Sequence, residues 1–157
     1  KKFSISVIQQ TSKENISNLK KFYDDQNIEN QIFDFEEKFH EIINFSDLCI
    51  TRAGASTLAE LVFLEIPHIA IPLPSAKDNH QFENAQFYFD IGCNWVFNQN
   101  EITSTNLKRK LFNIVENKED YLNKKSNMKN YNYENQRINR RRLCFCILCL
   151  ARLVTKP

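Results

Sequence analysis

The stretch of sequence that decides the fold is DLCITRAGASTLAE, residues 47–60. Asp47–Thr51 is typical of a short strand, 52–55 of a turn, and Ser56–Glu65 of a helix with leucines and a valine facing a core. A strand followed directly by a helix is the repeating unit of an α/β fold. Gly54, one of only two glycines in the chain, lies at the turn, where small residues let a ligand approach the backbone closely.

The alternation of strand and helix continues on both sides of this stretch. Further strands are expected at Phe3–Ile8, Gln31–Phe35, His68–Pro72 and Asn94–Phe97. Helices are expected at Ser12–Asp25 (Ile16, Leu19 and Phe22 on one face), Glu36–Phe45, His80–Ile91 (closed by Gly92 in the left-handed conformation), Ser104–Asn117 and Lys118–Met128. The pattern predicts an α/β fold, a Rossmann-like parallel sheet with helices on both faces and a ligand site beyond the carboxyl ends of the strands.

Size and composition limit the classes of function. The 157 residues suffice for one domain with a core, with 42% hydrophobic and 25% charged residues. A net charge of +2 gives no field that favours nucleic acid. The cysteine count is odd, and two thiols lie in apolar contexts, which indicates a reducing compartment without disulfides; the cysteines are Cys49, Cys93, Cys144, Cys146 and Cys149.

The loop at residues 52–60 has the chemistry of an anion site. A helix that begins at Ser56 or Thr57 offers N–H groups, a positive dipole end and two hydroxyls, which suits a diphosphate. Glu60, one turn further, can accept hydrogen bonds from a vicinal diol such as a ribose. The structural alternative is a capping box, in which Glu60 folds back to the Thr57 N–H and no ligand is involved.

A second loop, residues 72–81, again joins a strand end to a helix start and is rich in side chains that can bind sugar hydroxyls. The competing interpretation is that Asp78 caps the helix while His80 and Gln81 are solvated residues of its first turn. Loops of adjacent strand-helix units in a parallel sheet open onto the same edge. We therefore expect the two loops to lie side by side.

Three segments carry a family resemblance: SDLCITRAGASTLAEL, IPHIAIPLPSAKDNHQFENA and GCNWVF. Together they closely resemble the C-terminal domain of the MurG family, bacterial enzymes that use UDP-N-acetylglucosamine, and the resemblance runs from about Phe3 to Lys129. It implies the C-terminal half of a GT-B glycosyltransferase. It also implies an inverting hexosyltransferase that moves N-acetylglucosamine to lipid I, forming lipid II in peptidoglycan synthesis, with no cofactor and no obligatory metal.

The resemblance also implies roles for individual residues. The diphosphate would meet Ala55, Ser56 and Thr57 and the ribose would meet Glu60, within a loop and helix turn that include Gly54, Leu58 and Ala59. Gln81, with His80 beside it, would address the sugar or its phosphate, while Arg52 and Asn84 would support the loops. Uracil would lie at the helix start after the second strand, at Phe35 and Glu36, where Glu36 replaces an aliphatic residue common in the family.

The chain departs from the family pattern in what it lacks. Neither the acceptor-binding N-terminal domain nor the first strand with its glycine-rich turn is found in the sequence. No histidine is a persuasive base: His40 suits a surface or core position, His68 begins a buried strand, and His80 fits binding better. Residues 1–130 are therefore expected to bind the donor but not to turn it over alone, in a protein that is cytoplasmic and peripheral on the cytoplasmic face of the inner membrane.

Residues 131–157 form a tail unlike the family's closing helix. A basic segment precedes LCFCILCLARLV, residues 143–154, which is too short to cross a bilayer. The tail is interpreted as a packed terminal helix, an interfacial membrane anchor or sequence foreign to the domain, with the last preferred. Cys146 and Cys149 have metal-ligand spacing, but only Cys144 accompanies them, so no metal site is expected.

Two other functions remain open on the sequence. The chain could be a separate subunit similar to the eukaryotic donor-binding subunit that pairs with a membrane partner for dolichol-linked N-acetylglucosamine transfer. It could also be a UDP-sugar-binding module without catalysis, since no base is evident.

Overall fold

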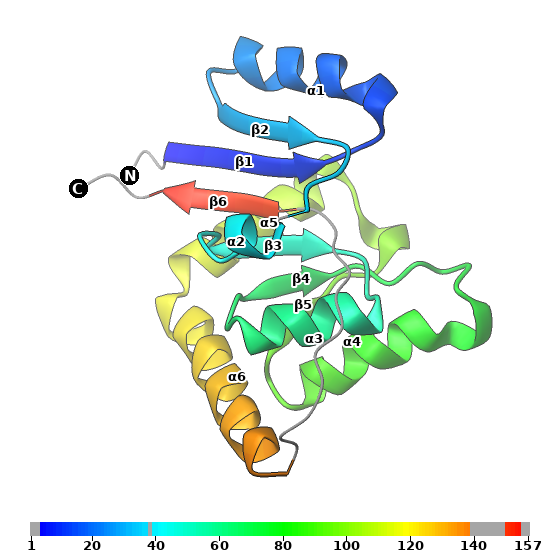
Figure 1. The fold of residues 1–157 in the computed structure, drawn as a ribbon, viewed down its shortest axis with the longest axis vertical. Helices are drawn as coiled ribbons and strands as arrows, with labels where there is room; N and C mark the ends of the chain where they lie inside the picture. The colour runs from blue at the N-terminus through cyan, green and yellow to red at the C-terminus, as the bar shows by residue number, and fades with distance from the viewer. Residues whose placement is uncertain (1–3, 38, 139–149, 155–157) are drawn as a thin grey trace.

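A six-stranded sheet forms the centre of the molecule (Figure 1). The computed structural model describes residues 4–37, 39–138 and 150–154. The strands are β1 (Ser4–Gln10), β2 (Glu29–Phe33), β3 (Leu48–Thr51), β4 (His68–Ala70), β5 (Asn94–Val96) and β6 (Leu150–Val154), in the order β2-β1-β6-β3-β4-β5. The pairs β1–β2, β3–β4 and β4–β5 are parallel, whereas β6 is antiparallel to both β1 and β3. The first five strands therefore point the same way, and the predicted parallel sheet needs correction only at its centre.

The helices lie on both faces of the sheet, as predicted. They are α1 (Lys13–Asp25), α2 (Phe39–Ile43), α3 (Ala55–Phe63), α4 (His80–Asp90), α5 (Ser104–Glu116) and α6 (Lys118–Ile138), with short 3-10 turns η1 (Lys77–Asn79) and η2 (Gln99–Glu101). On β3, Leu48 packs in the cluster that includes Ile114 of α5, whereas Cys49 packs in the cluster that includes Ile43 of α2 and Leu61 of α3. Successive strand residues point to opposite faces, so α5 covers one face and α2 and α3 cover the other.

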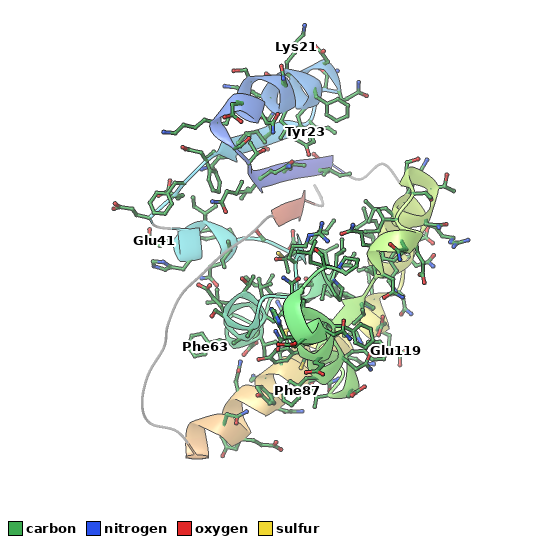
Figure 2. The ribbon with its side chains drawn as sticks, turned by 90° about the vertical axis from the view of Figure 1, so that its right-hand side faces the viewer. Lys21, Tyr23, Glu41, Phe63, Phe87 and Glu119 are labelled. Atoms are coloured by element: carbon green, nitrogen blue, oxygen red, sulfur yellow. The ribbon has the colours of Figure 1, made fainter. Side chains whose placement is uncertain are left out.

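Two further helices complete the layers. Ala85 and Tyr88 of α4 pack with Leu58 of α3 and Met128 of α6, which places α4 beside α3. At the β2–β1 end of the sheet, the Tyr23 hydroxyl of α1 donates a hydrogen bond to Gln9 Oε1 of β1 at 2.7 Å. Figure 2 shows Tyr23 on the side of α1 that faces the sheet. These contacts hold α4 against α3 and α6, and α1 against β1.

Two helices differ from the sequence prediction. Phe22 of α1 is 58% exposed, not buried, because α1 covers only the β1–β2 end of the sheet and turns Tyr23 towards it. Helix α2 is also shorter than predicted, since it begins at Phe39 and ends at Ile43. Gly92 has φ 74° after α4, which confirms its left-handed conformation.

The C-terminal part of the chain also differs. Helix α6, expected to end at Met128, continues to Ile138, and the ring of Tyr131 lies 6.1 Å from that of Tyr88. The prediction of a terminal helix is wrong for Leu150–Val154, which form β6. Residues 139–149, with three of the cysteines, lie outside the described residues.

Candidate functional site

The two predicted loops lie at one edge of the sheet. Strands β3 and β4 are parallel, and α3 and α4 both begin at the edge towards which these strands point (Figure 1). The Asn84 side chain of α4 donates a hydrogen bond to the Ala53 carbonyl at 3.1 Å. This bond joins α4, which follows the second loop, to the turn before α3, so the two loops lie at the same edge of the sheet as expected.

Helix α3 begins with an open N-terminus. Its N-cap is Gly54, with φ −68° and ψ 134° and no side-chain capping bond, and the first internal bond runs from Leu58 N to Gly54 O at 3.0 Å. The backbone N–H groups of the preceding helical positions therefore point out of the helix end. Of the predicted phosphate-binding residues, Ala55 and Ser56 are exposed and Thr57 is half-buried.

The capping-box interpretation of Thr57 and Glu60 is wrong. A capping box needs Thr57 at the N-cap, but the N-cap is Gly54, three residues earlier. Glu60 instead lies within the helix and is only 8% exposed. Its Oε1 atom is buried and has no hydrogen-bond partner among the described residues.

Burial changes the chemistry of Glu60. Desolvation raises the pKa of its carboxyl above the ordinary 4.5, and the nearby charge of His40 opposes part of this shift. A buried acceptor without a donor is costly to stability unless a ligand or water supplies the missing hydrogen bond. The buried, unpartnered carboxyl of Glu60 therefore fits a ligand-binding role better than a structural one.

The neighbours of Glu60 in α3 have different surroundings. Leu58 is fully buried in the core, and its N–H is bonded to Gly54 O, so it supports the helix and offers a ligand no donor. Ala59, in the second turn of the helix, is exposed. Of these two neighbours, only Ala59 has an exposed side chain.

Gly54 adopts a backbone conformation open to any residue. Its φ of −68° is ordinary, and a Cβ atom built there would meet only Thr57 Oγ1, at a comfortable 3.7 Å. The protein itself therefore does not require glycine at this turn. A small residue at this turn does, however, let a ligand approach the backbone closely.

The second loop is held in an unusual backbone conformation. Asp78 and Asn79 have φ 51° and 56°, in the left-handed region that Asp and Asn tolerate better than most residues. The expectation that Asp78 caps α4 is wrong, because the N-cap is Asn79 and no side-chain bond caps the helix. Gln81 Oε1 accepts a hydrogen bond from Leu73 N at 3.0 Å, which closes the loop, while His80 is exposed.

Arg52 has a partner that sequence reasoning missed. Its Nη1 atom donates to Ile71 O at 3.4 Å, as expected of a residue that supports the loops, and to Gln99 Oε1 at 2.6 Å. Gln99 lies 47 residues away in η2, after β5. No motif in the sequence marks Gln99, and only its place just beyond a predicted strand end could have suggested it.

The predicted uracil-contacting residues lie further along the same edge. Phe35 and Glu36 follow β2 in a loop, not at a helix start, because α2 begins only at Phe39. Phe35 is 71% exposed and Glu36 is half-buried. Since β1 and β6 separate β2 from β3, a spacing of about 4.8 Å per strand puts Glu36 on the order of 14 Å from the α3 loop.

Other features of the described residues lie outside this site. An open cavity of about 330 Å³ runs along β1 and β2, away from the α3 and α4 loops, and is lined by Ser6, Val7, Ile8, Glu29, Asn30 and Gln31. Across the described ranges, no group of three or more His, Cys, Asp or Glu side chains is placed to hold a metal ion. In the same part of the chain, no helix combines the length and apolarity needed to span a bilayer.

Comparison with known proteins identifies relatives over most of the chain. The chain is 55% identical over 135 residues to the UDP-N-acetylglucosamine--N-acetylmuramyl-(pentapeptide) pyrophosphoryl-undecaprenol N-acetylglucosamine transferase of Pelagibacter ubique (strain HTCC1062). The matched region covers 86% of this chain and 38% of the relative. The transferase of the same name from Rickettsia bellii (strain RML369-C) is 37% identical over 113 residues, 72% of this chain and 32% of the relative. The chain thus spans less than two-fifths of the length of these relatives.

A solved structure and a family model agree with these relatives. The crystal structure of Acinetobacter baumannii MurG superposes with a TM-score of 0.68 at 27% identity, covering 78% of this chain and 37% of that one. Residues 1–138 match the model of the glycosyltransferase family 28 C-terminal domain. The chain therefore belongs to the glycosyltransferase family 28 C-terminal domain family, with the α/β fold of the C-terminal half of a GT-B glycosyltransferase.

Proposed function

We propose that this chain binds UDP-N-acetylglucosamine as the donor-binding domain of an inverting hexosyltransferase. That enzyme would move N-acetylglucosamine to lipid I, forming lipid II in peptidoglycan synthesis. One observation carries the proposal: the open N-terminus of α3 lies one turn from the buried, unpartnered Oε1 atom of Glu60. The names of the relatives, which are N-acetylglucosamine transferases acting on a pyrophosphoryl-undecaprenol, support the choice of donor and acceptor.

The diphosphate is assigned to the start of α3. Backbone N–H groups at Ala55, Ser56 and Thr57, with the hydroxyls of the latter two, supply donors to phosphate oxygens. The helix dipole adds roughly half a positive elementary charge at this end. The same dipole stabilises negative charge on UDP as it leaves, so the binding site also favours transfer.

The ribose is assigned to Glu60. Its unpartnered Oε1 can accept a hydrogen bond from a ribose hydroxyl, which would satisfy the buried acceptor. A nucleotide with its phosphates at the α3 start and its ribose at Glu60 would then run along the sheet edge towards the loop of Phe35 and Glu36. This direction supports uracil contacts through that loop.

The sugar is assigned to the loop before α4. Gln81 uses its carbonyl oxygen to close the loop, which leaves its amide NH₂ as the group to contact a sugar hydroxyl or phosphate, with exposed His80 beside it. The acceptor, lipid I, and the base that deprotonates its hydroxyl are assigned to a part of the enzyme outside these loops. A lipid-linked acceptor also supports peripheral attachment to the cytoplasmic face of the inner membrane.

Titration calorimetry with UDP, UDP-N-acetylglucosamine and UDP-glucose tests the proposal on the full chain. Wild type should bind UDP and prefer UDP-N-acetylglucosamine to UDP-glucose, and Glu60→Gln should weaken UDP binding roughly tenfold, the typical loss for a charged hydrogen-bond acceptor. Glu116→Gln, at an exposed position of α5, is the matched control and should bind like wild type. Absence of heat and of any chemical-shift change at millimolar UDP would refute an autonomous donor site.

Stability provides a second readout for the same variant. Because burial raises the pKa of Glu60, its charged form costs folding free energy, and this cost appears as the pH rises above 4.5. Glu60→Gln should therefore be more stable than wild type at pH 7 and lose that advantage near pH 4, as measured by guanidinium unfolding. A variant that is less stable at pH 7 would instead indicate a structural role for the carboxylate.

A further inference from the structure

One arginine side chain crosses the carboxyl ends of three strands. Arg52 directly follows β3, Ile71 directly follows β4, and Gln99 lies in η2 after β5. Arg52 Nη1 donates to both, at 3.4 Å to Ile71 O and at 2.6 Å to Gln99 Oε1. The guanidinium is therefore fixed above the sheet edge where α3 and α4 begin.

The two hydrogen-bond partners of Arg52 do not neutralise its positive charge. Both are neutral oxygens, and in the described part of the chain no carboxylate forms an ion pair with this guanidinium. Both hydrogen bonds use the same nitrogen, Nη1, whereas a guanidinium has five N–H donors in a planar fork. An exposed arginine held in this way keeps both charge and donors for an anion.

We propose that Gln99 is a positioning residue that holds Arg52 ready for the diphosphate of the donor. This inference rests on the proposed function, since it names a contributor to the same phosphate site. A free arginine loses rotamer entropy when it is fixed, and a preformed hydrogen bond lowers that loss on binding. An amide suits this task because a carboxylate at residue 99 would hold Arg52 equally well but neutralise it.

Binding of UDP and of uridine to the full 157-residue chain tests the inference. Gln99→Met removes the acceptor at similar size and should weaken UDP binding between threefold and roughly tenfold, with uridine binding unchanged because uridine carries no phosphate. In an Arg52→Ala background, Gln99→Met should cause no further loss, since it acts through the arginine. Gln86→Met, which removes an exposed Gln86–Asp90 bond within α4, is the matched control.

The variant Gln99→Glu distinguishes the effect of holding Arg52 in position from the effect of its positive charge. It retains an acceptor for Arg52 but offsets the positive charge, so UDP binding should fall at least as far as in Gln99→Met. Three results would overturn the inference: unchanged UDP affinity in Gln99→Met, an equal loss for UDP and uridine, or the same loss without Arg52. Failure of wild type to bind UDP is a different result, which removes the proposed function and this inference with it.

Discussion

The two glycines of the chain differ in whether their backbone conformation requires glycine. Gly54 has an ordinary φ and room for a Cβ, whereas Gly92 has φ 74° and a Cβ atom there would clash with Asn127 Nδ2. Gly92→Ala should therefore lower the free energy of unfolding by at least about 1 kcal/mol, through backbone strain and the clash. Gly54→Ala should leave stability unchanged or raise it slightly, yet weaken UDP binding. Chemical denaturation and calorimetry on both variants check this pair, and equal destabilisation by the two would contradict it.

His68 gives the fold a pH dependence. Its side chain is fully buried, Nδ1 lies 3.0 Å from Ile66 O, and Nε2 has no partner among the described residues. Burial lowers the pKa of His68 from 6.5 to about 4, so the unfolded chain binds more protons between these values. Stability should thus fall as the pH drops from 6.5 to 4, by about 3 kcal/mol from this residue.

Guanidinium unfolding at several pH values measures the effect, and NMR titration assigns it to His68. His80→Gln, which changes an exposed histidine, should retain the decline. Protonation of His68 near pH 6.5 in the folded chain would contradict the prediction.

Single residues were the hardest level to predict from sequence. The choice between a capping box and a ligand-binding Glu60 depended on where α3 begins, and the observed N-cap, Gly54, lies three residues before Thr57. Gln99 was missed because its partner, Arg52, is 47 residues away and only the order of β3, β4 and β5 brings them together. Local sequence defines neither a helix start to the residue nor a contact across strands.

At the level of elements, the last turns of α6 are bonded to the C-terminal end of α3. Asn132 Nδ2 donates to Val62 O at 2.9 Å and to Phe63 O at 3.2 Å, at the C-terminal end of α3. Asn132→Ala should lower the free energy of unfolding by about 1 kcal/mol. Asn135→Ala is the matched control, because among the described residues its side chain bonds to Tyr131 O of its own helix and to no other element. Equal thermal midpoints for the two variants would contradict this role of α6.

Strands and helices were predicted well in number and order over residues 4–116, because their apolar periodicity is strong. The end of α6 was not, since its last ten residues, 129–138, are mostly polar and offer no apolar stripe. Contacts such as those of Tyr131 and Asn132 hold this segment in place. Such tertiary contacts override a weak local pattern.

At the level of the whole molecule, β6 joins two groups of parallel strands. It pairs with β1 on one side and β3 on the other, so it satisfies backbone groups of both. A chain that ends at Ile138 should lose protection from amide hydrogen exchange in β1 and β3, because both would become edge strands. It should also associate more readily, as size-exclusion chromatography can show. Unchanged exchange rates in the two strands would contradict a structural role for β6.

The sequence by itself determined the α/β class, the order of the first five strands along the chain and the position of the two loops at strand ends. These follow from local periodicity and from the rule that parallel strands expose their carboxyl ends together. Only the tertiary structure decided that Glu60 is buried without a partner, that Gln99 holds Arg52 and that β6 enters the sheet antiparallel. Burial and pairing depend on segments distant in the chain, and no local pattern of residues encodes which of them meet.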